Sequence, residues 1–131
     1  MKILIVEDNE ISNNLLTVIL EAEGYDVLRA YNGCNAYKII EKNTDIELVI
    51  SDIQMPIIDG YTLLSMVRGN EKYKNIHFIL YSAYFTYLNN KKMAYELGAD
   101  LFIAKTGHNQ VILDAANFFA KNGNGNSIRT I

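Results

Sequence analysis

The stretch Leu48-Val-Ile-Ser-Asp52 is the most informative part of the sequence, because its first three residues form an unbroken apolar run and a carboxylate follows almost directly. A continuous run of this kind is typical of a strand that is covered on both faces, whereas a half-exposed strand alternates apolar and polar residues. Similar runs lie at Ile3–Val6, Phe78–Leu80 and Leu101–Ile103. Together these runs predict the buried strands of a parallel sheet.

A weaker apolar run, Val27–Ala30, contains an arginine and therefore suits an edge of the same sheet. Apolar residues at helical spacing lie between and after the runs. They predict five helices, around Ile11–Ala22, Cys34–Lys42, Leu63–Val67, Leu88–Leu97 and Val111–Phe119.

The first predicted helix has the longest amphipathic pattern. We expect its apolar face to consist of Ile11, Leu15, Val18, Ile19 and Ala22, which recur at steps of three and four residues. Gly24 is expected to follow its last turn, and Gly98 the last turn of the fourth helix. The apolar face of the fifth helix is expected to comprise Val111, Ala115, Phe118 and Phe119.

Strands that alternate with helices predict a parallel sheet with right-handed crossovers. Five strand–helix units are too few for a closed barrel of eight, so we expect an α/β fold with a doubly wound five-stranded sheet and helices on both faces. A length of 131 residues fits one domain. We assign residues 1–121 to this domain and the Asn/Gly-rich residues 122–131 to a flexible tail or the start of a linker.

The composition narrows the class of protein. The net charge is −3, which does not favour nucleic acid or an anionic membrane as the main partner. The single cysteine, Cys34, excludes an intrachain disulfide framework, and no apolar run approaches the length of a signal peptide or a membrane span. We therefore expect a cytoplasmic protein.

Polar residues follow four of the predicted strands directly. The pairs are Glu7-Asp8, Ser51-Asp52, Ser82-Ala83 and Ala104-Lys105. In open α/β sheets, ligands bind outside the carboxyl ends of the strands, near the point where the strand order reverses. The sequence therefore predicts one crevice that contains three carboxylates, one hydroxyl and one ammonium group.

Three carboxylates about 5 Å apart would repel one another by roughly 3 kcal/mol per pair at an effective dielectric constant near 20. A cation can remove this repulsion, and hard oxygen ligands suit Mg²⁺ or Mn²⁺. A divalent cation beside a carboxylate, a lysine and a hydroxyl is typical of phosphoryl transfer. Asp52 is the best candidate nucleophile, because it stands at the tip of the central apolar strand.

The loop that follows Asp52 supports this site. It contains Pro56, the only proline of the chain, which fixes the backbone after the strand. Asp59-Gly60 then offers a turn and an N-cap for the next helix.

These motifs, in this order and spacing, resemble the receiver domain of two-component response regulators. The resemblance rests on Ile3–Asn9, on the stretch Asp52–Gly60 with its Met-Pro pair, on Ser82-Ala83 and on Lys105. It covers residues 1 to about 121 and implies a flavodoxin-like strand order of 2-1-3-4-5.

The resemblance implies a phosphoacceptor and a metal site. Asp52 would accept a phosphoryl group from a phosphohistidine of a histidine kinase or a histidine phosphotransfer protein. Glu7, Asp8, Asp52 and the main-chain carbonyl of Gln54 would bind Mg²⁺. The domain would catalyse its own phosphorylation and slow dephosphorylation without turning over an external product, so we do not class it as an enzyme.

The resemblance also assigns the conformational switch. Lys105 would pair with the phosphoryl group, Ser82 would hydrogen-bond to it, and the aromatic ring of Phe102 would change its position. A downstream protein target would then bind the face formed by the fourth helix, fifth strand and fifth helix. Gln54 and Tyr84 occupy the positions that tune self-dephosphorylation, and Tyr84 would shield the acyl phosphate from water.

The sequence departs from the family at three points: Lys105 is followed by Thr106 where proline is usual, Glu7 stands where many relatives have aspartate, and Ser82 replaces a threonine. Two other functions remain open. A pseudo-receiver would keep the fold and bind proteins without phosphorylation, although its usual mark, the loss of the acceptor or of the acidic pair, is absent. A flavin carrier or small phosphatase would share the sheet, but the acidic residues after the first strand would repel its phosphate.

Overall fold

A computed structural model describes residues 1–105 and 109–122 of the chain, without the side chains of 84–89. Its five strands form one parallel sheet in the order β2-β1-β3-β4-β5, which confirms the predicted fold and strand order. The strands are β1 (Lys2–Val6), β2 (Asp26–Ala30), β3 (Ile46–Asp52), β4 (His77–Ala83) and β5 (Leu101–Lys105).

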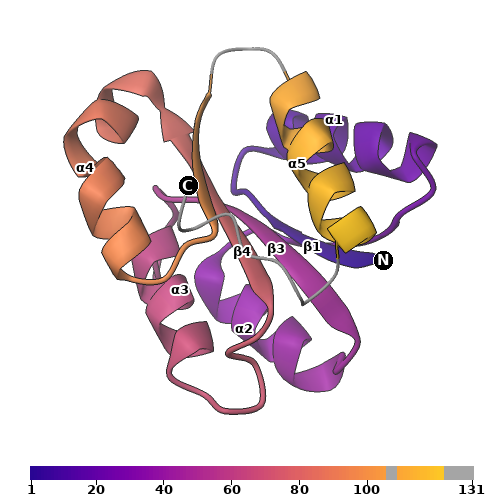
Figure 1. The fold of residues 1–131 in the computed structure, drawn as a ribbon, viewed down its shortest axis with the longest axis horizontal. Helices are drawn as coiled ribbons and strands as arrows, with labels where there is room; N and C mark the ends of the chain where they lie inside the picture. Colours follow the sequence, from indigo (N-terminus) through magenta and orange to yellow (C-terminus); the bar gives the residue numbers. More distant parts are fainter. Residues whose placement is uncertain (106–108, 123–131) are drawn as a thin grey trace.

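Five helices cover the two faces of this sheet (Figure 1). They are α1 (Glu10–Ala22), α2 (Gly33–Lys42), α3 (Gly60–Arg68), α4 (Tyr84–Glu96) and α5 (Gln110–Asn122). Helices α1 and α5 lie on one face and α2, α3 and α4 on the other (Figure 1). Helix α4 begins four residues before the predicted Leu88, and α5 includes Asn122, the first residue of the predicted tail. The rest of that tail lies outside the described residues.

The core has two parts because the central strands send side chains to both faces of the sheet. Leu4 and Val49 pack on the side of α2, α3 and α4, whereas Ile5 and Ile50 pack on the side of α1 and α5. All four side chains are fully buried. This arrangement explains why the central strands read as unbroken apolar runs. The weaker run at Val27–Ala30 lies in β2 at the edge of the sheet, as predicted.

Local capping signals set the helix ends. The side chain of Asn9 accepts a hydrogen bond from the Ser12 N–H of α1 (2.9 Å), and that of Asp59 accepts one from the Thr62 N–H of α3 (2.8 Å). The predicted glycine after α1, Gly24, has a φ angle of +99°, a conformation that a side chain would disfavour. None of the helices in the described part of the chain combines the length and the hydropathy that a membrane span requires.

The predicted apolar face of α1 is wrong. Ile11, Leu15 and Val18 point to solvent, with exposed fractions of 79%, 49% and 63%. The residues that α1 buries are instead Asn13, Leu16, Thr17 and Leu20. The prediction for α5 fails in the same way at Val111, which is exposed, while Ile112 and Ala116 are buried.

Two polar residues explain why α1 buries a different face from the predicted one. The amide of Asn13 donates hydrogen bonds to the carbonyl oxygens of Glu7 (3.0 Å) and Ala30 (3.1 Å), at the ends of β1 and β2. The Thr17 hydroxyl donates to the carbonyl of Asn13 (2.8 Å). Because their polar atoms have partners, these side chains can be buried at little cost.

Candidate functional site

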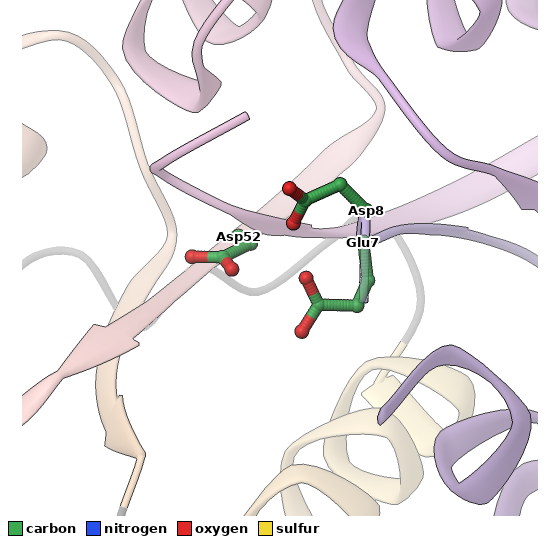
Figure 2. A group of neighbouring side chains, drawn as sticks. All are labelled: Glu7, Asp8 and Asp52. Carbon is green, nitrogen blue, oxygen red and sulfur yellow. The ribbon is translucent and has the colours of Figure 1, made fainter. Parts of the chain in front are cut away.

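The three predicted carboxylates converge at the carboxyl ends of two neighbouring strands. Glu7 and Asp8 follow β1 directly, and Asp52 is the last residue of β3, which pairs with β1. Each contributes a carboxylate oxygen to a group whose members all lie within 4.8 Å of one another. Figure 2 shows the carboxylates gathered around a common space.

The three carboxylates differ in their contact with solvent. Glu7 is fully buried and Asp52 is 7% exposed, whereas Asp8 is exposed. Asp8 also lines a cavity of about 650 Å³, together with residues of the loop after β3 that include Gln54 and Asp59. The acidic cluster is therefore reached from solvent on the side of Asp8.

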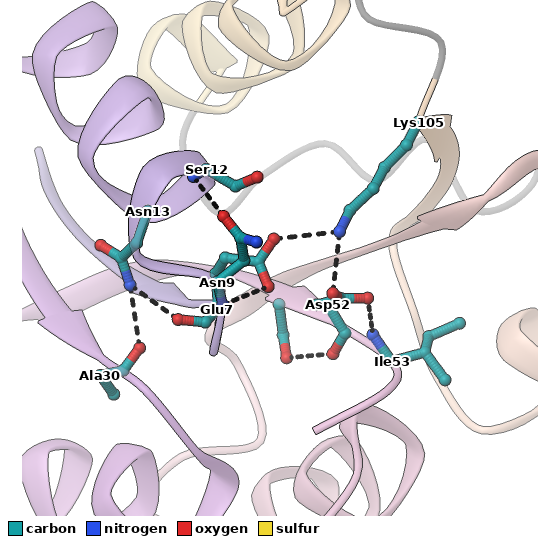
Figure 3. Close-up of polar contacts among 9 residues, drawn as sticks. Glu7, Asn9, Ser12, Asn13, Ala30, Asp52, Ile53 and Lys105 are labelled. Atoms are coloured by element: carbon teal, nitrogen blue, oxygen red, sulfur yellow. Dashed lines mark hydrogen bonds and ion pairs between the residues drawn. The ribbon is translucent and has the colours of Figure 1, made fainter. Parts of the chain in front are cut away.

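The ammonium group of Lys105 bridges the two buried carboxylates. Its Nζ lies 3.0 Å from Glu7 Oε1 and 2.8 Å from Asp52 Oδ2 (Figure 3). Lys105 ends β5, which is separated from β3 by β4, so its side chain reaches across the end of one strand. The structure thus brings four of the predicted site residues into a single cluster.

Charge within the cluster is only partly balanced. Burial raises the pKa of Glu7 to about 7, and the neighbouring charge of Asp52 adds to this, although Lys105 opposes the increase. Burial lowers the pKa of Lys105, but its bonds to Asp52 and Glu7 more than offset this, and the net change is upward. One ammonium group cannot neutralise three carboxylates. The hard oxygen donors therefore fit a divalent cation such as Mg²⁺.

The end of β3 and the following loop hold the Asp52 carboxylate in place. Its Oδ1 accepts a hydrogen bond from the Ile53 N–H (2.6 Å), while Oδ2 contacts Lys105. The loop then returns so closely that a Cβ on Gly60 would collide with the main-chain carbonyl oxygen of Asp52. The Gly60 N–H donates to the Ile53 carbonyl (2.8 Å). A glycine at position 60 is thus required by this close approach.

The predicted switch residues lie on the neighbouring strands. Ser82 is 2% exposed near the end of β4, where it pairs in register with Ala104 of β5. Phe102 is 3% exposed, and its ring packs in the core on the side of α4. Its N–H donates to the hydroxyl of Tyr95 in α4 (3.1 Å). The roles predicted for Ser82 and Phe102 remain predictions.

The predicted tuning residues are only partly described. Gln54 is exposed and lines the cavity beside Asp8, but nothing tests the predicted role of its carbonyl. Tyr84 is the first residue of α4, and its side chain lies outside the described residues. The peptide between Lys105 and Thr106 also lies outside them.

Two residues near the site were missed by sequence reasoning. Asn13 fixes the main chain of Glu7 (Figure 3), but it lies between two other polar residues, Ser12 and Asn14, and nothing in the local sequence separates it from them. Tyr81 precedes Ser82 in β4, and its ring centroid lies 4.7 Å from the Lys105 ammonium nitrogen. Nothing in the local sequence separates Tyr81 from an ordinary strand aromatic.

Comparison with known proteins gives a consistent result. The family of the response regulator receiver domain matches residues 3–117. The chain is 37% identical over 82 residues to the CAI-1 autoinducer sensor kinase/phosphatase CqsS of Vibrio cholerae, and 33% identical over 81 residues to a chemotaxis protein CheY homolog of Campylobacter jejuni. These matches span 62% and 61% of this chain, but only 12% of the kinase and 62% of the CheY homolog.

Solved structures agree with this match. The response regulator TrrA of Thermotoga maritima, solved in complex with Mg²⁺-BeF, superposes with a TM-score of 0.78 at 30% identity. The superposition covers 89% of this chain and 96% of TrrA.

Proposed function

The chain belongs to the response regulator receiver domain family of two-component systems, and on that premise we propose that it is a Mg²⁺-dependent phosphoryl acceptor. Asp52 accepts the phosphoryl group from a phosphohistidine of a histidine kinase or a histidine phosphotransfer protein. The phosphorylated state then changes how the domain binds a downstream protein.

One observation carries this proposal: the Lys105 ammonium contacts Asp52 and Glu7 at the same time. A carboxylate that is held by a backbone N–H and faces an ammonium is oriented for attack, and its product remains paired with a cation. A purely structural ion pair would need neither the third carboxylate, Asp8, nor its access to solvent.

The transfer step is a displacement at phosphorus. An oxygen of the Asp52 carboxylate forms a bond to phosphorus while the phosphorus–nitrogen bond of the phosphohistidine breaks. The leaving imidazole keeps the bonding electron pair and later takes up a proton from solvent. Throughout the step, the Ile53 N–H fixes the acceptor carboxylate, and Lys105 stabilises the negative charge of the phosphoryl oxygens.

We propose that Glu7, Asp8, Asp52 and the main-chain carbonyl of Gln54 bind Mg²⁺. When bound, the cation neutralises charge on the phosphoryl oxygens. The hard oxygen donors of the acidic cluster support this assignment, as does the Mg²⁺-BeF complex of the related TrrA.

The exposed stripe of α1, Ile11, Leu15 and Val18, suits the phosphohistidine-bearing partner. Helix α1 begins at Glu10, three residues after Glu7, so its first turns lie next to the site. Exposed apolar residues at this spacing are typical of a helix that packs against another helix. We propose that the donor packs here while its histidine reaches Asp52.

The downstream target is proposed to bind the face of α4, β5 and α5. The ring of Phe102 packs in the core under α4, and the Phe102 N–H donates to the Tyr95 hydroxyl of that helix, so a movement of the ring would alter this face. Ser82 would move toward the phosphoryl group to begin this change.

The domain catalyses only its own phosphorylation and dephosphorylation. We place it in the cytoplasm, with protein rather than nucleic acid as its partner.

Incubation with acetyl phosphate and Mg²⁺ tests the proposal, with intact mass as the measurement. We expect the gain of one phosphoryl group in the native protein and none in Asp52→Asn. A native protein that gains no phosphoryl group would favour the pseudo-receiver alternative, in which the fold binds partners without phosphorylation.

A further inference from the structure

Tyr81 of β4 is buried against the acidic cluster from a strand that supplies no carboxylate to it. The residue is 2% exposed and pairs in register with Asp52 of β3. Its ring centroid lies 4.7 Å from the Nζ of Lys105, the same atom that bridges Glu7 and Asp52. The aromatic ring therefore forms part of the wall that surrounds the Lys105 ammonium group.

The hydroxyl of Tyr81 is buried and has no hydrogen-bond partner among the described residues. An unpartnered buried hydroxyl is costly and rare, so its presence needs a reason. Burial, then the charges of Glu7 and Asp52, and then the approach of the hydroxyl to the Glu7 side chain raise the pKa of Tyr81. The phenol therefore stays protonated and faces the Glu7 carboxylate, to which it can donate a hydrogen bond.

Phosphorylation would create a need for that donor. In the present state, Glu7 Oε1 accepts its hydrogen bond from Lys105. If the proposed function holds, Lys105 turns to the phosphoryl group and its bond to Glu7 weakens. Glu7 is fully buried, so even when its other oxygen binds Mg²⁺ as proposed, an Oε1 without a donor would carry a large penalty.

We propose that Tyr81 is a positioning residue of the phosphorylated state: its hydroxyl donates to the Glu7 carboxylate once Lys105 has turned to the phosphoryl group. The inference rests on the proposed function and deepens it, because it assigns a role to a residue outside the predicted site. The hydroxyl then has no hydrogen-bond partner in the unphosphorylated state because it serves as a donor in the phosphorylated state.

Titration with beryllofluoride and Mg²⁺, a stable analogue of the phosphoryl group, tests this role in Tyr81→Phe. The substitution keeps the ring beside Lys105 and removes only the hydroxyl. We expect beryllofluoride to bind about tenfold more weakly, because a hydrogen bond to a charged group is lost. The thermal midpoint of the unliganded protein should stay equal or rise, because an unpartnered buried hydroxyl has been removed.

Tyr73→Phe is the matched control, because it removes the same hydroxyl from a buried tyrosine that lies between α3 and β4, at the opposite end of the strands from the acidic cluster. We expect native beryllofluoride affinity in this variant. Native affinity in Tyr81→Phe would overturn the inference, and so would weaker binding together with a lower thermal midpoint, which indicates a packing defect. If the native protein itself fails to bind beryllofluoride, the proposed function fails, and the inference with it.

Discussion

The ammonium of Lys105 lies 3.0 Å from the Glu7 carboxylate, although 98 residues separate them along the chain. The same ammonium contacts Asp52, so a single positive charge holds together two buried negative ones. A bound divalent cation would act on the same carboxylates. Lys105 and the metal are therefore expected to compete for negative charge and to cooperate only once a phosphoryl group is present.

Lys105→Gln should separate these two effects. Removing the ammonium leaves more uncompensated negative charge for Mg²⁺, so we expect about tenfold tighter Mg²⁺ binding by calorimetry. Phosphorylation by acetyl phosphate should become at least about tenfold slower, because the charge of the phosphoryl oxygens loses its partner.

The matched control is Lys92→Gln, which removes the same charge from an exposed position on α4. It should leave both measurements unchanged. Weaker Mg²⁺ binding in Lys105→Gln would contradict the competition between the ammonium and the metal.

Glu7 should make the metal-free protein less stable as the pH rises. Its pKa in the folded state is about 7, above the value near 4.3 expected in the unfolded chain. The stability linked to Glu7 is therefore fully present below about pH 4.3 and is lost as the pH rises through 7. Relative to Glu7→Gln, the native protein should lose on the order of 3 kcal/mol of unfolding free energy across this window.

Urea denaturation of both proteins at several pH values, in the presence of a chelator, measures this difference. Other titrating groups cancel in the comparison between native protein and variant. A difference that does not change between pH 4 and 8 would show that the carboxyl group of Glu7 titrates in the folded protein as it does in the unfolded chain.

Asn13→Ala should weaken both the fold and the site. It removes the side chain that donates to the carbonyls of Glu7 and Ala30, so we expect a loss of about 2 kcal/mol in unfolding free energy. Mg²⁺ should also bind more weakly, because the main chain that carries Glu7 is less well fixed.

Asn14→Ala provides the comparison, since Asn14 is exposed and its side chain accepts a hydrogen bond from Arg29 at the surface. Its unfolding free energy should change by less than about 0.5 kcal/mol. Equal losses of unfolding free energy in the two variants would show that the buried hydrogen bonds of Asn13 contribute no more to stability than the exposed one of Asn14.

Phe102→Trp turns the proposed switch into an optical signal, because the chain contains no other tryptophan. Residue 102 is buried in the unphosphorylated state, so the emission should be blue-shifted at first. Beryllofluoride with Mg²⁺ should shift it to the red if the ring leaves the core. The larger ring costs about 1–3 kcal/mol of stability through overpacking. An emission maximum that does not change on addition of beryllofluoride and Mg²⁺ would argue against a switch at residue 102.

The fold and the site cluster were predictable from the sequence for one reason. The carboxyl ends of parallel strands meet at one edge of the sheet, so residues that directly follow apolar runs must come together. Glu7, Asp8, Asp52 and Lys105 all follow or end such runs, and their convergence is confirmed by their contacts. The roles of Gly24 after α1 and of Asp59 as the N-cap of α3 were equally predictable, because helix ends depend on local chemistry.

The buried face of α1 was not predictable in this way. The helix carries apolar residues on two sides, and periodicity alone favoured Ile11, Leu15 and Val18. The true orientation depends on Asn13, which meets carbonyl groups of two different strands, one of them 17 residues away. The contact between the Tyr81 ring and the Lys105 ammonium likewise joins two strands. Such contacts exist only after the sheet has assembled.

Chemical mapping of the phosphoryl group tests the central claim most directly. The native protein is phosphorylated with acetyl phosphate and Mg²⁺, the acyl phosphate is reduced with borohydride, and the peptides are sequenced by mass spectrometry. Reduction converts a phosphorylated aspartate to homoserine. We predict homoserine at position 52 alone, and none when Mg²⁺ is removed with a chelator. Homoserine at Asp8 or Asp59, or labelling at Asp52 that does not depend on Mg²⁺, would contradict the account.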